Sequence, residues 1–278
     1  MHNDPCRILV FGAHPDDAEF FAGGFLHNHV AQGNAVRIIS VTNGQSGHHS
    51  LPPDTLVQRR RMEASASAAV LGCEACVWDF PDGYLTPSIP VRESIIREIR
   101  EFQPDLVLTH RPWDYHPDHR AVGQAIQDAS YMVMVPKIVP GTPVPQREPV
   151  VAYMADLFTK PLPFQPDFIL DATPYLDGVV HMLAQHTSQF GEWLPWIEKI
   201  VVPHAVGSGE WVSWLKSWFL EKAQPRRDRF WQNHWGHPPL LVEAFEISEY
   251  AGRLSPQQIQ LLFPNCHQSP ASSLPTKS

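Results

Sequence analysis

Short apolar runs alternate with helix-like stretches through the first 130 residues, and this alternation constrains the fold more than any other feature of the sequence. Strands are expected at residues 7–12, 36–41, 76–79 and 105–109, and helices at 20–32, 55–71, 91–102 and 121–132. A strand that is buried on both faces has a continuous apolar sequence, and strands that alternate with helices pair in parallel. The pattern therefore predicts a parallel sheet with right-handed crossovers.

We predict an α/β, Rossmann-like fold, in which a mostly parallel sheet has helices on both faces and carries an elaborated C-terminal lobe. Residues 1–135 would form the catalytic core and residues 136–266 the remaining sheet and the lobe of the same domain, while residues 267–278 would be a disordered tail. A proline-rich stretch at 136–149 and a tryptophan-rich stretch at 190–235 are expected to form a lid, a pocket wall or an oligomer contact. In this half, strands are expected at 150–154 and 168–170, a strand or a short buried segment at 240–247, and helices at 175–189 and 197–219.

Two polar motifs follow the first and the fourth predicted strand. The first motif, Ala13–Glu19, contains His14, Asp16 and Asp17, and the second contains His116, Asp118 and His119. In a doubly wound sheet with the strand order 3-2-1-4, these two strands are neighbours at the topological switch point, where ligands bind at the carboxyl ends of the strands. The sequence therefore predicts that the two motifs meet in one site.

The residue types in the two motifs are those that hold a catalytic zinc ion. Zinc favours imidazole nitrogen and carboxylate oxygen, and a catalytic site has three protein ligands and a position left for water. His14, Asp17 and one histidine of the second motif would make such a set. Each motif taken alone could also be a turn that caps the following helix, but two such motifs at adjacent strand ends favour a metal site.

Composition excludes several other classes of function. The formal net charge of −8 and the absence of a long basic tract argue against nucleic acid as a partner. The sequence has no run of about 18 apolar residues and no signal-peptide pattern, so we expect no membrane span and a cytoplasmic location. Of the four cysteines, Cys73 and Cys76 form a CxxC, which we interpret as small buried thiols rather than a redox or metal site.

Together the two motifs resemble those of the PIG-L/LmbE-like deacetylases, which are zinc-dependent enzymes that remove N-acetyl groups, typically from compounds containing N-acetylglucosamine. The resemblance is convincing over residues 7–130. It also includes an Arg-x-x-Glu helix that ends in Leu-Gly, a Pro-Asp-Gly turn and a late Glu-Ala-Phe segment, at Arg60–Glu63 with Leu71-Gly72, at Pro81–Gly83 and at Glu243–Phe245.

The resemblance implies a division of labour among the polar residues. Zn²⁺ would be bound by His14, Asp17 and His119, and Asp16 would be the general base. A protonated His116 would donate a hydrogen bond to the oxyanion of the tetrahedral intermediate. Asp118 would orient His116 and keep it cationic.

Further expectations concern the substrate and the alternatives. Arg60 and Asp82 match family positions that contact substrate, which would be a small-molecule amino-sugar derivative, and the chain could form a homo-oligomer. A zinc amidase that cleaves another amide, such as a thiol conjugate, is an alternative within the same chemistry. A non-catalytic sugar-binding protein on the same fold is an alternative from another class. A dinucleotide-binding domain is excluded, because Gly12-Ala13-His14 replaces the glycine-rich fingerprint.

Overall fold

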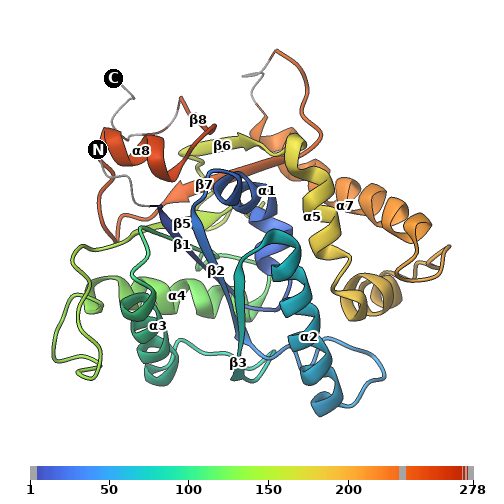
Figure 1. Ribbon diagram of the computed structural model, residues 1–278, viewed down its shortest axis with the longest axis horizontal. Coiled ribbons are helices and arrows are strands. Elements are labelled where there is room, and N and C mark those ends of the chain that lie inside the picture. Colours follow the sequence, from blue (N-terminus) through green and yellow to red (C-terminus); the bar gives the residue numbers. More distant parts are fainter. Residues whose placement is uncertain (1–4, 232–235, 271, 273, 275–278) are drawn as a thin grey trace.

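A single eight-stranded sheet runs through the computed structural model, which describes residues 5–231, 236–270, 272 and 274 (Figure 1). The strand order is β3-β2-β1-β4-β5-β7-β6-β8. Strands β1 to β5 are parallel, whereas β7 is antiparallel to both β5 and β6, and β8 is antiparallel to β6. The strands are β1 (Arg7–Gly12), β2 (Ala35–Thr42), β3 (Glu74–Phe80), β4 (Leu106–Thr109), β5 (Val150–Met154), β6 (Phe168–Asp171), β7 (Val242–Ile247) and β8 (His267–Gln268). The predicted fold class is confirmed, and β1 and β4 are neighbours as expected.

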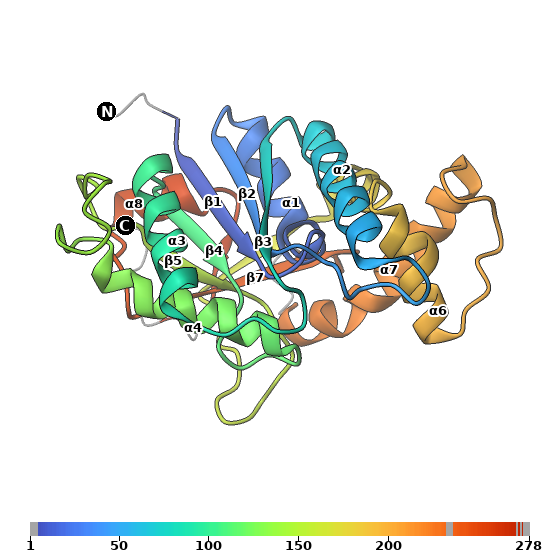
Figure 2. The same cartoon turned by 90° about the horizontal axis from the view of Figure 1, so that it is seen from below.

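Helices cover both faces of the sheet (Figure 2). They are α1 (Asp17–Ala31), α2 (Pro53–Leu71), α3 (Ile89–Phe102), α4 (Pro117–Met132), α5 (Leu176–Leu183), α6 (Leu194–Glu198), α7 (Gly209–Phe230) and α8 (Pro256–Leu262), with a 3₁₀ turn at Thr173–Tyr175 and a π-helical turn at Ser188–Trp193. Alternate residues of β1 supply two cores, because successive side chains of a strand point to opposite faces. Ile8 and Val10 pack toward α1, α5 and α7, while Leu9 and Phe11 pack toward α3 and α4.

Two helices begin earlier than predicted, and this changes where the motifs lie. Helix α1 begins at Asp17 rather than near residue 20, and α4 begins at Pro117 rather than at residue 121. His116 is the N-cap of α4, and its side chain accepts a hydrogen bond from the backbone N–H of Asp118. Asp17 and His119 therefore lie on the first turns of two helices, not in loops ahead of them.

The second half departs further from the predicted elements. The expected helix at 175–189 ends at Leu183, and the expected helix at 197–219 is replaced by α7, which begins after Ser208. The Ser208 hydroxyl caps α7 by accepting from the N–H of Trp211, a start signal that the hydrophobic pattern obscured. The tail expected from residue 267 is wrong at its start, because His267–Gln268 pair with β6; residues 271, 273 and 275–278 lie outside the described residues.

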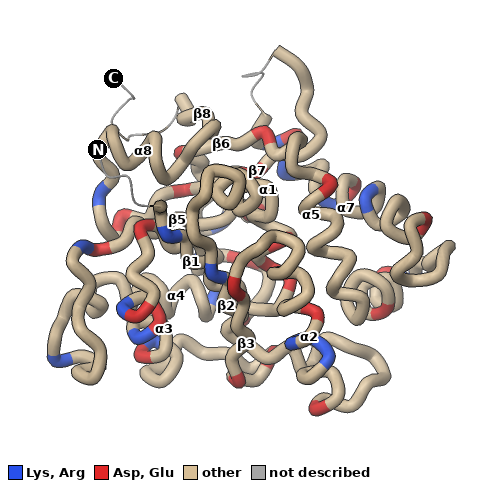
Figure 3. The backbone as a smooth tube through the Cα atoms, in the orientation of Figure 1, with Lys and Arg blue, Asp and Glu red and all other residues tan. Residues whose placement is uncertain are grey.

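The side chain of Arg100 holds much of the proline-rich stretch at 136–149 in place. The buried guanidinium of Arg100 donates hydrogen bonds to the backbone carbonyls of Ile138, Val139 and Thr142, and to others just before them. Cys73 is half-buried and Cys76 is exposed, so the interpretation as buried thiols is wrong for Cys76. Acidic and basic residues are interspersed along the described chain (Figure 3). None of its helices is long and apolar enough to cross a membrane.

Candidate metal centre and active site

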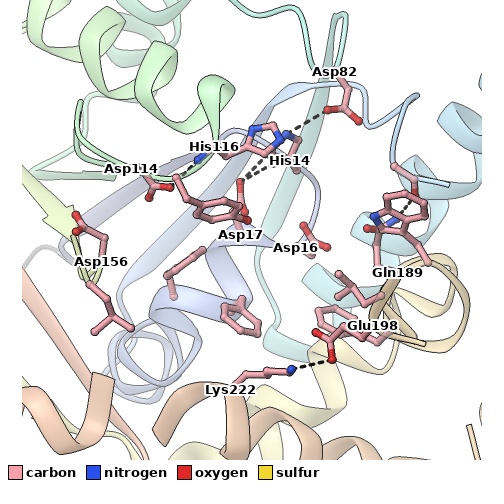
Figure 4. A pocket seen from close by; sticks show the side chains of 18 of the residues that line it. His14, Asp16, Asp17, Asp82, Asp114, His116, Asp156, Gln189, Glu198 and Lys222 are labelled. Atoms are coloured by element: carbon pink, nitrogen blue, oxygen red, sulfur yellow. Dashed lines mark hydrogen bonds and ion pairs between the residues drawn. The ribbon is translucent and has the colours of Figure 1, made fainter. Parts of the chain in front are cut away.

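The two polar motifs meet at the carboxyl ends of β1 and β4 (Figure 4). Two glycines allow the segments to approach this closely. A Cβ at Gly12 would lie 2.9 Å from the Cβ of Asp17, and a Cβ at Gly123 would lie 2.5 Å from the carbonyl oxygen of His110. The first turn of α1 and the first turn of α4 are thereby held against the strand ends that precede them.

His14, Asp17 and His119 present their donor atoms to one another. The Nδ1 atom of His14 lies 3.3 Å from Nε2 of His119, and these two nitrogens lie 3.4 Å and 3.3 Å from the two carboxylate oxygens of Asp17. Two imidazole nitrogens and a carboxylate that converge in this way form a His₂Asp donor set suited to zinc. The geometry thus fits the metal that the resemblance implies.

Each histidine of this set has carboxylates at its other ring nitrogen. Asp114 Oδ1 lies 3.1 Å from Nδ1 of His119, while Asp82 Oδ1 and Asp118 Oδ2 lie 3.2 Å and 3.4 Å from Nε2 of His14. Carboxylates in this position fix the orientation of metal-binding histidines and raise their basicity. Burial opposes a charge on His119, but Asp17 and Asp114 outweigh it and raise its pKa to about 9. A metal ion must therefore displace protons when it binds.

His110 and Asp114 are site residues that lie outside the two motifs. The Nε2 atom of His110 lies 3.1 Å from Asp17 Oδ2, and its ring stacks on His119 with the ring centroids 3.8 Å apart. Both residues lie between β4 and the second motif. Their position in the chain was visible in the sequence, but only the direction of their side chains shows that they contact Asp17 and His119.

Asp16 lies beside the donor set on a strained backbone. Its φ of 142° is in the region that favours glycine, and residues other than glycine are held there only when the surrounding structure enforces it. Arg60 Nη2 donates to the carbonyl oxygen of Pro15 at 2.6 Å and lies 3.2 Å from Asp16 Oδ2. Burial raises the pKa of Asp16 to about 6, against the opposing charge of Arg60. Asp16 is thus fixed by its backbone and by one cation.

The Asp118 carboxylate has hydrogen-bond partners other than the expected His116. The Asp118 carboxylate accepts from the N–H groups of Gly83 and Leu85 and faces His14, while its backbone N–H donates to Nδ1 of His116. Because Nδ1 acts as an acceptor, neutral His116 carries its proton on Nε2. Burial and the charges of His14 and His119 lower the pKa of His116, so this ring can donate from Nε2 without the extra proton that we expected.

The site opens into a cavity of about 520 Å³. Its wall opposite the strand ends comes from residues 190–226, where Phe190, Trp193, Glu198, Trp218, Lys222 and Arg226 line it. Arg60 and Asp82 also line this cavity, but both have partners: Arg60 contacts Asp16, and Asp82 contacts His14 and the N–H of Ser46. Their contact with a substrate remains a prediction. No residue of 136–149 is in the lining.

Fold and site together define a class, namely an α/β protein with a candidate set of metal ligands at the strand ends and a carboxylate beside it. Residues 9–130 match the PIG-L family model, described as GlcNAc-PI de-N-acetylase, so the resemblance is confirmed over this part of the chain. The match covers the elements from β1 to α4, which hold all the predicted site residues.

Curated relatives include enzymes of two kinds. The 4-oxalmesaconate hydratase of Pseudomonas putida is 27% identical over 185 residues, which cover 64% of this chain and 71% of the hydratase. The 1D-myo-inositol 2-acetamido-2-deoxy-alpha-D-glucopyranoside deacetylase of Nocardioides is 24% identical over 168 residues, which cover 47% of this chain and only 55% of that enzyme. The solved N,N'-diacetylchitobiose deacetylase of Pyrococcus horikoshii has the same fold, with a TM-score of 0.70 and 22% identity over 89% of this chain and 85% of that one.

Proposed function

We propose that the protein is a zinc-dependent N-deacetylase that removes an acetyl group from a small amino-sugar derivative in the cytoplasm. The observation that carries this proposal is the donor set of His14, Asp17 and His119, whose converging atoms lie 3.3–3.4 Å apart, with Asp16 fixed beside it. The match to the PIG-L family model and the deacetylases among the relatives support the acetyl amide as the bond that is cleaved.

His119 is favoured over His116 as the second imidazole ligand. His119 is fully buried, faces Asp17 with one nitrogen and has Asp114 at the other, whereas His116 is half-buried and uses Nδ1 to cap α4. A zinc ion held by this set would act as a Lewis acid toward an amide carbonyl and would lower the pKa of a water molecule.

The residues of the chain supply the proton transfers. Asp16 takes a proton from the attacking water as general base and then gives it to the departing amine as general acid. Arg60 keeps the Asp16 carboxylate in place through its contacts with Asp16 and with the carbonyl of Pro15. His116 donates from Nε2 to the oxygen on which negative charge develops. Asp82 and Asp118 act through His14, which they orient.

A second candidate is the addition of water to a carbon–carbon double bond of an unsaturated acid, favoured by the hydratase relative. The two reactions are separated by metal analysis combined with two assays on the zinc-loaded protein. Free amine released from N-acetylglucosamine glycosides supports deacetylation, whereas loss of enoate absorbance supports hydration. The deacetylase proposal fails if no N-acetyl substrate yields amine.

A further inference from the structure

Arg226 is the cation of the pocket wall that remains without an ion-pair partner. Its side chain belongs to α7, lines the cavity and is only 7% exposed. The other cations of the lining are paired: Arg60 lies 3.2 Å from Asp16, and Lys222 lies 2.7 Å from Glu198. No carboxylate of the described chain forms an ion pair with Arg226. Burying a charge costs free energy unless the charge is paired. We therefore expect a group from outside the chain to pair with Arg226.

The described carboxylates around Arg226 are already occupied. Both oxygens of Glu243 accept backbone N–H groups of α1, from Gly24 at 2.8 Å and from Phe25 at 2.7 Å. Asp114 lies 3.1 Å from Nδ1 of His119. The charges of Glu243 and Asp114 still act on Arg226 from a distance, but burial outweighs them and lowers its pKa to about 10, so it stays charged at neutral pH.

Contacts with α1 hold the guanidinium of Arg226 in place but use only one of its nitrogens as a hydrogen-bond donor. It lies 4.8 Å from the ring centroids of both Phe20 and Phe21, and one nitrogen, Nη2, donates to the Phe20 carbonyl at 3.1 Å. An arginine has five N–H donors in a rigid fork that matches a carboxylate. The other donors have no partner among the described residues.

This cation lies one aromatic ring away from the metal centre. The Phe21 ring, which contacts Arg226, also lies 6.1 Å from His119 and 5.6 Å from His110, measured between ring centroids. In Figure 4 the neighbouring pair of Lys222 and Glu198 lies on the opposite side of the pocket from His14 and Asp82. A molecule the size of a monosaccharide, with its acyl group at the donor set, would bring a substituent toward this wall.

We propose that Arg226 binds a carboxylate of the substrate, so that the protein acts on an N-acetylated amino sugar that carries an acidic substituent rather than on a neutral one. This inference rests on the proposed deacetylase function and adds the substrate class. Arg226 selects the substrate; it takes no part in proton transfer.

The test compares substrates that differ only in charge. N-acetylglucosamine carrying a carboxymethyl group on the anomeric oxygen, or on O4, is assayed beside its methyl ester with the zinc-loaded protein. We expect the acid to be preferred over the ester in kcat/KM by about 10- to 100-fold in one of the two pairs, the range for a hydrogen bond to a charged group. Equal rates on acid and ester in both pairs would overturn the inference while the deacetylase function stands.

Variants then assign the preference to this residue. Arg226→Gln is expected to abolish the preference by raising KM for the acid, and Arg226→Lys to retain part of it. The matched control, Lys216→Gln, removes a charge from the same helix where Lys216 pairs with Asp177, and should keep the full preference. A preference that survives intact in Arg226→Gln, with thermal unfolding unchanged, assigns the carboxylate to another residue and sinks the proposal.

Binding measured without turnover separates the two proposals. The corresponding N-deacetylated acid and ester, which have no acetyl group to lose, are titrated calorimetrically into wild type and Arg226→Gln. Tighter binding of the acid that depends on Arg226, without amine release from any N-acetyl compound, keeps the anion site and refutes the deacetylase function. Equal binding of acid and ester by the wild type refutes the anion site.

Discussion

The two walls of the pocket are built on opposite principles. On the wall formed by the strand ends, the carboxylates lie within ion-pair distance of a cation or an imidazole: Asp16 of Arg60, Asp17 of His119, and Asp82 of His14. The wall formed by residues 190–226 has three aromatic rings, from Phe190, Trp193 and Trp218, and one buried cation, Arg226, that has no such neighbour among the described residues. The charged groups of the first wall pair with one another, whereas we expect Arg226 of the second wall to pair with the substrate. We expect substitutions to affect turnover on the first wall and selectivity on the second.

The largest effect is expected from a matched pair of carboxylates in the first motif. Asp16→Asn should lower kcat by about 100- to 10,000-fold, the usual contribution of a general base, and should keep its zinc. Asp17→Asn should lose the zinc, because its carboxylate faces both imidazole donors. Metal content by mass spectrometry and amine release are measured on both variants. Equal metal loss in the two would contradict the separate roles of these neighbours.

The next largest effect is on the free energy of unfolding, at Glu243, a buried carboxylate whose charge acts on Arg226 of the second wall. Burial raises the pKa of Glu243 to about 7, from an ordinary value of 4.5. The folded state then binds more protons than the unfolded state between these pH values, so the stability contributed at this site falls as pH rises from 4.5 to 7 and is level above that. Glu243→Gln should remove this fall, which amounts to roughly 3 kcal/mol at most.

The measurement for Glu243 is urea unfolding of wild type and Glu243→Gln at several pH values between 5 and 8. The quantity of interest is the difference in unfolding free energy between the two proteins, because other titrating groups contribute equally to both. A difference that does not change with pH would show that Glu243 has an ordinary pKa in the folded protein.

The two walls differ in how much of their structure could be predicted from the sequence. Short apolar runs such as Ile8–Phe11 and the polar residues that follow them predicted the order β3-β2-β1-β4 and the meeting of His14 with a histidine of the second motif, since both are local patterns combined with one topological rule. The choice of His119 came from the family resemblance. The partners of Asp118 could not be predicted from the sequence, because its carboxylate accepts from the N–H groups of Gly83 and Leu85, which are distant in the chain, and faces His14 instead of His116.

The second wall was beyond sequence reasoning for a physical reason. Arg226 reaches the pocket because α7 packs against α5 and β7 and contacts Phe20 of α1. The segment between α5 and α7 contains a π-helical turn and a short helix that no periodic pattern predicts. The tryptophan-rich stretch was expected to serve as a lid, a wall or an oligomer contact, and Trp193 and Trp218 do line the pocket. That Arg226 is unpaired among the described residues is apparent only when every other charge of the pocket has been assigned a partner.

A smaller effect is expected for a carboxylate that orients a metal-binding histidine without binding the metal itself. Asp114→Asn removes the carboxylate that lies 3.1 Å from Nδ1 of His119 and should weaken zinc affinity by about 10- to 100-fold, the usual effect of losing such a partner. The matched control is Glu198→Gln, which removes a carboxylate from the α7 side of the same pocket and should leave zinc affinity unchanged. Competition with a fluorescent chelator measures both. An unchanged affinity in Asp114→Asn would place His119 outside the ligand set.

The smallest effect is expected at the rim of the second wall, and it sharpens the contrast between two cations of one helix. Lys222 is paired with Glu198 at 2.7 Å, and about a third of each side chain is exposed. Such pairs contribute about 0–1 kcal/mol, so Lys222→Gln should change the unfolding free energy by no more than that. Because Glu198 already neutralises its ammonium group, this variant should also keep the preference for the acidic substrate that Arg226→Gln loses. If Lys222→Gln lost that preference instead, the carboxylate would bind at the rim rather than beside Phe20 and Phe21, and the buried Arg226 would serve only to hold α7 against α1.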